Sequence, residues 1–146
     1  MISSLEFNDL EKTIEALLSN AKKRYSIHEE IFGDDKVVEV TEGYFDKLSK
    51  YNTNESIKLL QKEVVFLVNN IDKKTLHNLF LIYLIGSSGP DFNDPCKEYK
   101  NRLKEAKQLA EDEYYRNNKF LDIEYKYLKN YLYNGMNYCR KNFIEK

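Results

Sequence analysis

Leu79-Phe80-Leu81-Ile82-Tyr83-Leu84-Ile85, followed by Gly86-Ser87-Ser88-Gly89-Pro90, is the stretch of sequence that decides the fold. A helix with so many consecutive apolar residues has no polar side for solvent, so we expect other helices to surround it. We interpret Gly86 as the residue that ends this helix. A chain of 146 residues is long enough to bury a real core. The stretch therefore predicts one helical domain built around residues 79–85.

The flanking segments repeat apolar residues at helical spacing and predict further helices around this centre. They are residues 8–25, 54–70, 94–115 and 121–142. The start signals of three of them are Asn8 or Asp9, Thr53 or Asn54, and Asp94-Pro95. We expect 54–70 to pair with the central helix as a tight hairpin, since very little chain separates the two. The predicted fold class is all-α, a single-domain bundle of about five helices over residues 1–146.

Residues 33–53 interrupt the helical period and predict an irregular segment, with weak strand-like alternation over 36–40. Much of this segment is acidic. Within 29–46 a single Lys36 accompanies the acidic residues Glu29, Glu30, Asp34, Asp35, Glu39, Glu42 and Asp46. The oxygen-ligand pattern of a calcium loop is absent, so a solvated charged segment is the favoured interpretation over a cation site.

Motifs for catalysis or metal binding are missing from the sequence. His28-Glu29-Glu30-Ile31-Phe32 begins like a zinc-protease helix, but Phe32 stands where the second histidine ligand is needed. The two cysteines, Cys96 and Cys139, fit a reducing compartment and are interpreted as core residues. We therefore predict no catalytic residues, no metal and no cofactor.

Tyrosines are concentrated in the second half of the chain. Eight of the twelve lie between Tyr99 and Tyr138, and those at 127, 131 and 138 share one face of the last predicted helix, beside several cations. Tyrosine and arginine are favoured at protein interfaces, so this group predicts a contact surface. The alternative is that the tyrosines only cover the edge of the helix bundle and bind no partner. The candidate partner interface is Tyr127, Tyr131, Tyr133, Tyr138, Lys126, Lys129, Arg140, Glu29, Glu30, Asp34 and Asp35.

Gly135 lies inside the apolar stripe of the same predicted helix. Glycine there lowers helix propensity by about 1 kcal/mol relative to alanine. We therefore expect a helix or loop to pack closely against it.

The order of several short motifs resembles a bacterial all-helical family catalogued only as a domain of unknown function. The motifs are Asn20-Ala21-Lys22-Lys23-Arg24, the Leu-rich 76–85 helix with its Gly86–Gly89 turn, and Tyr131-Leu132-Tyr133-Asn134-Gly135-Met136. Ser87 stands where the family favours arginine. The resemblance implies an all-helical fold and no particular activity.

The leading functional hypothesis is a non-enzymatic protein-interaction module, a regulator or inhibitor encoded by a bacterium or phage, that binds another protein or itself. The first alternative is nucleic-acid binding through the basic second half and the tyrosine and lysine face of the last predicted helix. The cations of 94–115 that it would use are interpreted as spread over more than one face, and they are Lys97, Lys100, Arg102, Lys104 and Lys107. The second is a small ligand-binding domain or enzyme at the Gly86–Pro90 turn, where Ser87, Ser88 and Cys96 are the nearest polar side chains. No secretory signal or membrane-spanning run is seen, which predicts a cytoplasmic protein.

Overall fold

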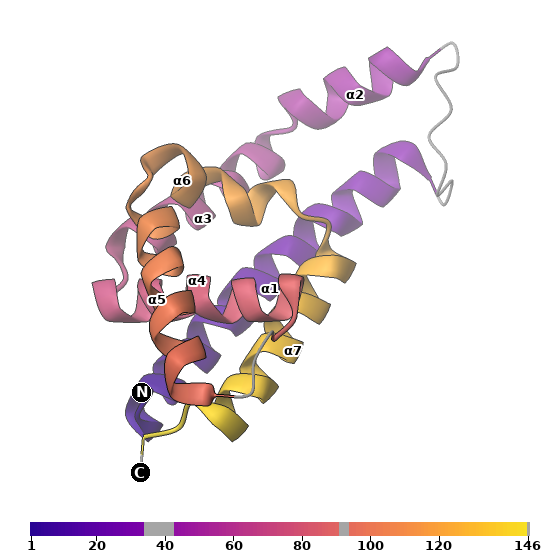
Figure 1. Cartoon of the computed structure of the whole chain (residues 1–146). Coiled ribbons are helices and arrows are strands. Elements are labelled where there is room, and N and C mark those ends of the chain that lie inside the picture. Colours follow the sequence, from indigo (N-terminus) through magenta and orange to yellow (C-terminus); the bar gives the residue numbers. More distant parts are fainter. Residues whose placement is uncertain (34–42, 91–93, 146) are drawn as a thin grey trace.

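The computed structural model describes residues 1–33, 43–90 and 94–145, and these form seven helices (Figure 1). They are α1 (Ser4–Phe32), α2 (Tyr44–Thr53), α3 (Glu55–Asn70), α4 (Lys73–Ser88), α5 (Pro95–Glu111), α6 (Glu113–Asp122) and α7 (Tyr125–Asn142). The described residues contain no strand, only an isolated parallel bridge between Ile2 and Ile144 that brings the two termini together. The all-α prediction is confirmed, but the expectation of about five helices is wrong.

Helix α4 is the centre of the bundle, as its sequence predicts. Residues 79–85 are all buried, and four of them have no exposed surface at all. Helices α7 and α5 are the main neighbours of α4, and α1 contacts it as well. Full burial of one such side chain stabilises a fold by about 1.5–3 kcal/mol, so this run accounts for much of the apolar driving force.

Two glycines allow α4 and α7 to approach closely. A Cβ added at Gly135 would overlap the backbone carbonyl of Ile82, and a Cβ added at Gly86 would overlap that of Tyr131. Ile82 of α4 meets Gly135 of α7, and Gly86 of α4 meets Tyr131 of α7. The two helices therefore run antiparallel along this contact, and each contributes one glycine to it. The expected close approach at Gly135 is confirmed. Gly86, by contrast, does not end α4, which continues to Ser88 and is capped by Gly89 at φ 77°.

The predicted hairpin of α3 with α4 is not formed. Ile71 and Asp72 alone connect the two helices, yet α3 packs against α6, α1 and α2 whereas α4 packs against α7 and α5. Asn54 caps the start of α3, where it accepts a hydrogen bond from the backbone N–H of Ile57, and Asp72 caps the start of α4, where it accepts one from the backbone N–H of Thr75. The two helices therefore pack against different neighbours although only two residues connect them.

The fourth predicted helix is divided in two. Asp112 ends α5 and caps α6, accepting a hydrogen bond from the backbone N–H of Tyr115 at 3.0 Å. The gap left between the predicted helices 94–115 and 121–142 is wrong, since residues 116–119 lie inside α6. Asp94 and Pro95 begin α5 as predicted, but Cys96 is exposed and is not a core residue. Cys139 is buried as expected.

Helix α1 is longer than its predicted range in both directions. Ser3 caps its start in place of Asn8 or Asp9, because the Ser3 hydroxyl accepts a hydrogen bond from the Glu6 N–H. The helix continues to Phe32, where Gly33 ends it. Residues 44–53, expected to be irregular, form α2. The strand-like pattern at 36–40 falls outside the described residues.

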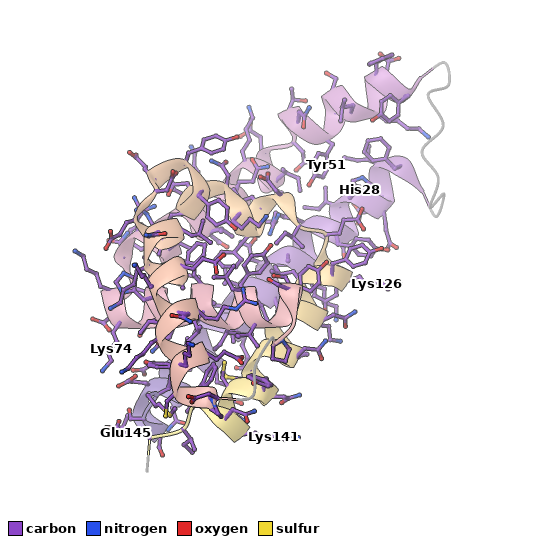
Figure 2. The ribbon with its side chains drawn as sticks, viewed as in Figure 1. His28, Tyr51, Lys74, Lys126, Lys141 and Glu145 are labelled. Carbon is purple, nitrogen blue, oxygen red and sulfur yellow. The ribbon has the colours of Figure 1, made fainter. Side chains whose placement is uncertain are left out.

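Helix α2 and the C-terminal part of α1 extend from the rest of the bundle as an arm (Figure 1). Aromatic rings hold the arm together: His28 stacks on Phe32 with centroids 4.4 Å apart and meets the edge of Tyr51 at 5.4 Å, and Phe32 also contacts Tyr44. Figure 2 shows His28 and Tyr51 facing each other across the arm. No residue of α2 is buried, so the arm is held by this cluster and not by the main core.

Arg24, a buried cation of α1, connects three helices. Its guanidinium donates to the carbonyls of Phe120 and Leu121 at the C-terminus of α6, each at 3.4 Å, and to Asn20 at 2.8 Å. Asn20 in turn donates to the Leu60 carbonyl of α3. A cation is favourable at a helix C-terminus because unpaired carbonyls concentrate partial negative charge there. Arg24 therefore fixes α6 against α1.

Candidate interaction surfaces

The tyrosines predicted as an interface are divided by the fold into exposed and packed residues. Tyr127 and Tyr133 are exposed on α7. Lys126 is exposed as well, and Lys129 lies over the Tyr133 ring, 6.0 Å from its centroid. Two tyrosines and two lysines thus remain exposed on α7, and Lys126 is labelled in Figure 2.

Tyr131 and Tyr138 are both half-buried and contribute to the fold. Tyr131 contacts the ring of Tyr83 at 6.1 Å, and its backbone lies against Gly86. Tyr138 packs edge-on against Phe143. Sequence spacing correctly places these tyrosines on one face of α7, but that face lies along the edge of the packed bundle, so only part of it is free.

The charged members of the predicted interface do not gather in one place. Arg140 forms an ion pair with Glu11 of α1 at 3.1 Å. Glu29 and Glu30 lie in the last turns of α1, on the arm. Asp34 and Asp35 fall outside the described residues. The predicted set therefore comprises at least two separate surfaces.

Glu98 is a buried carboxyl whose role the sequence does not reveal. It lies in the first turn of α5 with no exposed surface. Burial raises the pKa of Tyr138, and a hydrogen bond with Glu98 raises it further. Burial also raises the pKa of the Cys139 thiol, with a smaller contribution from the Glu98 charge. This cluster joins the start of α5 to the end of α7 and keeps Cys139 in the unreactive thiol form.

The Gly86–Pro90 turn does not have the geometry of the predicted anion site. Ser87 and Ser88 donate their hydroxyl hydrogen bonds to the Leu84 carbonyl of the same helix. The N–H groups at the start of α5, which would have held the anion, donate instead to the Asp94 carboxylate from Cys96 and Lys97. The polar groups of this turn are thus used in capping the two helices.

An apolar groove that the sequence analysis did not find lies along the outer face of α3. Its volume is about 650 Å³, and Leu59 and Phe66 on its wall are 62% and 70% exposed. The full lining consists of Leu59, Lys62, Glu63, Phe66, Leu67, Asn70 and Ile71. The opposite face of α3 is buried through Ile57, Val64 and Val68. Helix α3 therefore carries two apolar stripes. One is buried in the bundle, and the other lines the groove.

Helix α5 carries a row of lysines, which we call the α5 lysine row: Lys97, Lys100, Lys104 and Lys107. All four are exposed. With 3.6 residues per turn they fall within a sector of about 80°. These four lysines therefore share one face. Arg102 lies on another side of α5, where it pairs with Glu105, so the cations of this helix as a set occupy more than one face, as expected.

Neither a metal centre nor a membrane-crossing helix is found in the part of the chain that the structure describes. No group of three or more His, Cys, Asp or Glu side chains there is placed to hold a metal ion, and no helix there is long and apolar enough to cross a membrane. Comparisons with family models, curated proteins and solved structures found no match. The functional proposal therefore rests on the surfaces described above.

Proposed function

We propose that this chain is a non-enzymatic protein-interaction module whose main contact surface is the outer face of α3. The observation that carries this proposal is the groove of about 650 Å³ between the exposed side chains of Leu59 and Phe66. Single exposed apolar residues are ordinary, but apolar residues that line one continuous groove are typical of a protein contact. Helices with apolar residues seven apart commonly bind a second helix along that line.

The charged residues beside the groove favour binding of α3 from a second molecule of this chain. Leu59 and Phe66 are seven residues apart and so lie only about 20° from each other around the helix. Lys62 and Glu63 flank them on opposite sides. In a parallel helix pair related by a twofold axis, each flank of one helix meets the opposite flank of the other. Lys62 would then lie beside the partner's Glu63, and the reverse contact would form on the other side.

This arrangement also pairs the apolar residues with themselves, Leu59 on Leu59 and Phe66 on Phe66. Helix α3 is 16 residues long, or about 24 Å. One helix face of this length buries less surface than the roughly 800 Å² per partner of a standard interface. We therefore expect a weak, concentration-dependent dimer with a dissociation constant on the order of 10 μM.

Mass measurement over a range of concentrations tests this function. We expect light scattering coupled to size exclusion to show a monomer–dimer equilibrium for the unchanged chain, and a monomer for the Leu59→Ser/Phe66→Ser variant. The matched control is Leu5→Ser/Phe45→Ser, because Leu5 and Phe45 are 77% and 70% exposed and lie on α1 and α2. The control should dimerise like the unchanged chain.

A chain that stays monomeric at 500 μM would contradict the second-copy occupant. The proposal of a protein-interaction module would itself be contradicted if, in addition, a photo-crosslinking residue at position 66 captured no more protein from a cell extract than one at position 45.

Tyr127 and Tyr133 form a second proposed contact surface. Their replacement by serine leaves the packed Tyr131 and Tyr138 intact, so loss of a partner in that variant could be separated from loss of the fold.

A further inference from the structure

The α5 lysine row has no partner within the described part of the chain. None of its four lysines forms an ion pair with a described residue. Two of the three acidic residues of α5 lie away from the row: Glu98 is buried and Glu105 pairs with Arg102. Glu111, four residues after Lys107, lies on the side of the row and offsets the charge of its last turn. From Lys97 to Lys107 the row is therefore a strip of positive charge with no carboxylate of α5 in its own sector.

The spacing of the row suits a linear polyanion. From Lys97 to Lys107 the helix rises about 15 Å. One strand of a nucleic acid carries a phosphate about every 3.4 Å along the duplex axis, so the row spans about four phosphates. Asn101 and Gln108 are exposed beside the lysines and can donate hydrogen bonds to phosphate or sugar oxygens.

We propose that the α5 lysine row binds the phosphate backbone of nucleic acid without reading its sequence. This function is separate from the α3 contact and uses a different helix. An anionic lipid surface fits the row less well, because helices that lie on membranes insert an apolar face beside their cations. The apolar side of α5 is packed in the bundle, with Ala106 and Ala110 buried and Leu103 half-buried. The row also carries no exposed aromatic ring for base stacking, which favours backbone contact.

The test compares two variants of equal net charge. In the row variant, Lys97, Lys100, Lys104 and Lys107 are replaced by glutamine. In the control variant, the exposed lysines Lys12, Lys22, Lys47 and Lys58 of α1, α2 and α3 are replaced instead. Each change removes four positive charges, so both variants carry a net charge of −5 in place of −1. Any general effect of charge is thus the same in the two.

Binding is measured by fluorescence anisotropy with a labelled 20-base-pair duplex and with each single strand of it, from 50 to 200 mM salt. Four phosphate contacts predict a slope of log K against log salt of about −3.6, and so about a 150-fold loss of affinity over this range. The row variant should bind at least tenfold more weakly at 50 mM salt, whereas the control variant should bind like the unchanged chain.

Three results would overturn the proposal. They are no binding of either duplex or strand at 50 mM salt, equal loss of affinity in the two variants, and selective binding of phosphatidylserine vesicles in place of nucleic acid. Circular dichroism of both variants should match the unchanged chain, because all eight lysines are exposed. Failure of this proposal would leave the α3 dimer unaffected, since the mass measurement does not involve α5.

Discussion

Gly86 and Gly135 are positions at which the contact between α4 and α7 leaves no room for a side chain. Each lies where a Cβ would meet the backbone of the opposite helix, and backbone cannot rotate away as a side chain can. We expect Gly135→Ala to destabilise the protein by about 1–3 kcal/mol through overpacking, although alanine is the better helix former. Chemical denaturation measures the change in the free energy of unfolding. Asn134→Ala is the control, since Asn134 is exposed on the same helix, and a Gly135→Ala variant as stable as this control would contradict the close approach.

His77 reports on the charge around the end of the α5 lysine row. Burial lowers the pKa of His77, Lys107 lowers it further, and Glu111 partly offsets both. Because the pKa in the folded chain is below the value of 6.5 expected without these effects, the unfolded chain takes up the proton first as pH falls. The contribution of His77 to stability is therefore present above pH 6.5 and is lost as pH decreases below it.

We expect Lys107→Gln to raise the pKa of His77 and Glu111→Gln to lower it. A proton NMR titration of the two histidines measures both changes, with His28 on the arm as the internal reference. If neither substitution changed the pKa of His77, the proposed effects of Lys107 and Glu111 on His77 would be wrong.

At the scale of elements, sequence patterns predicted helices more reliably than their ends and neighbours. The central position of α4 was predictable because residues 79–85 leave no polar side. Its end was mistaken because Gly86 fits a helix terminus as well as a close helix contact, and only the position of α7 distinguishes the two. The break at Asp112 was missed because Ala110 and Tyr114 keep the helical period across it. The pairing of α3 was wrong because linker length does not determine which helices pack together.

Arg24 of α1 donates hydrogen bonds to two carbonyls at the end of α6 and so links the two helices. We expect Arg24→Met, which keeps most of the side-chain volume, to lower the free energy of unfolding by about 1–3 kcal/mol, because the carbonyls of Phe120 and Leu121 lose their donors. Relative to the unchanged chain, the Arg24→Met variant should show a larger increase in amide hydrogen exchange in α6 than in α4. Lys22→Met, at an exposed position of the same helix, should have little effect, and equal effects of the two substitutions would contradict this role.

At the scale of the whole molecule, the fold leaves only part of the predicted interface exposed. Tyr127 and Tyr133 are exposed as an interface requires, but Tyr131 and Tyr138 are used for packing, and sequence spacing gives the face of a helix without saying what covers it. The α3 groove was missed for the same reason. Leu59 and Phe66 fit the composition of a core helix, and their exposure follows from the placement of α3 at the edge of the bundle.

Disulfide trapping at position 59 tests the proposed α3 contact most directly. In a Cys96→Ser background, which removes the exposed native thiol while the buried Cys139 stays inert, Leu59→Cys places a thiol opposite its own copy. We predict that mild oxidation produces a covalent dimer, that adding Phe66→Ser abolishes it, and that Leu5→Cys in the same background yields none. Equal rates of dimer formation at positions 5 and 59, or no covalent dimer at position 59, would contradict the α3 contact.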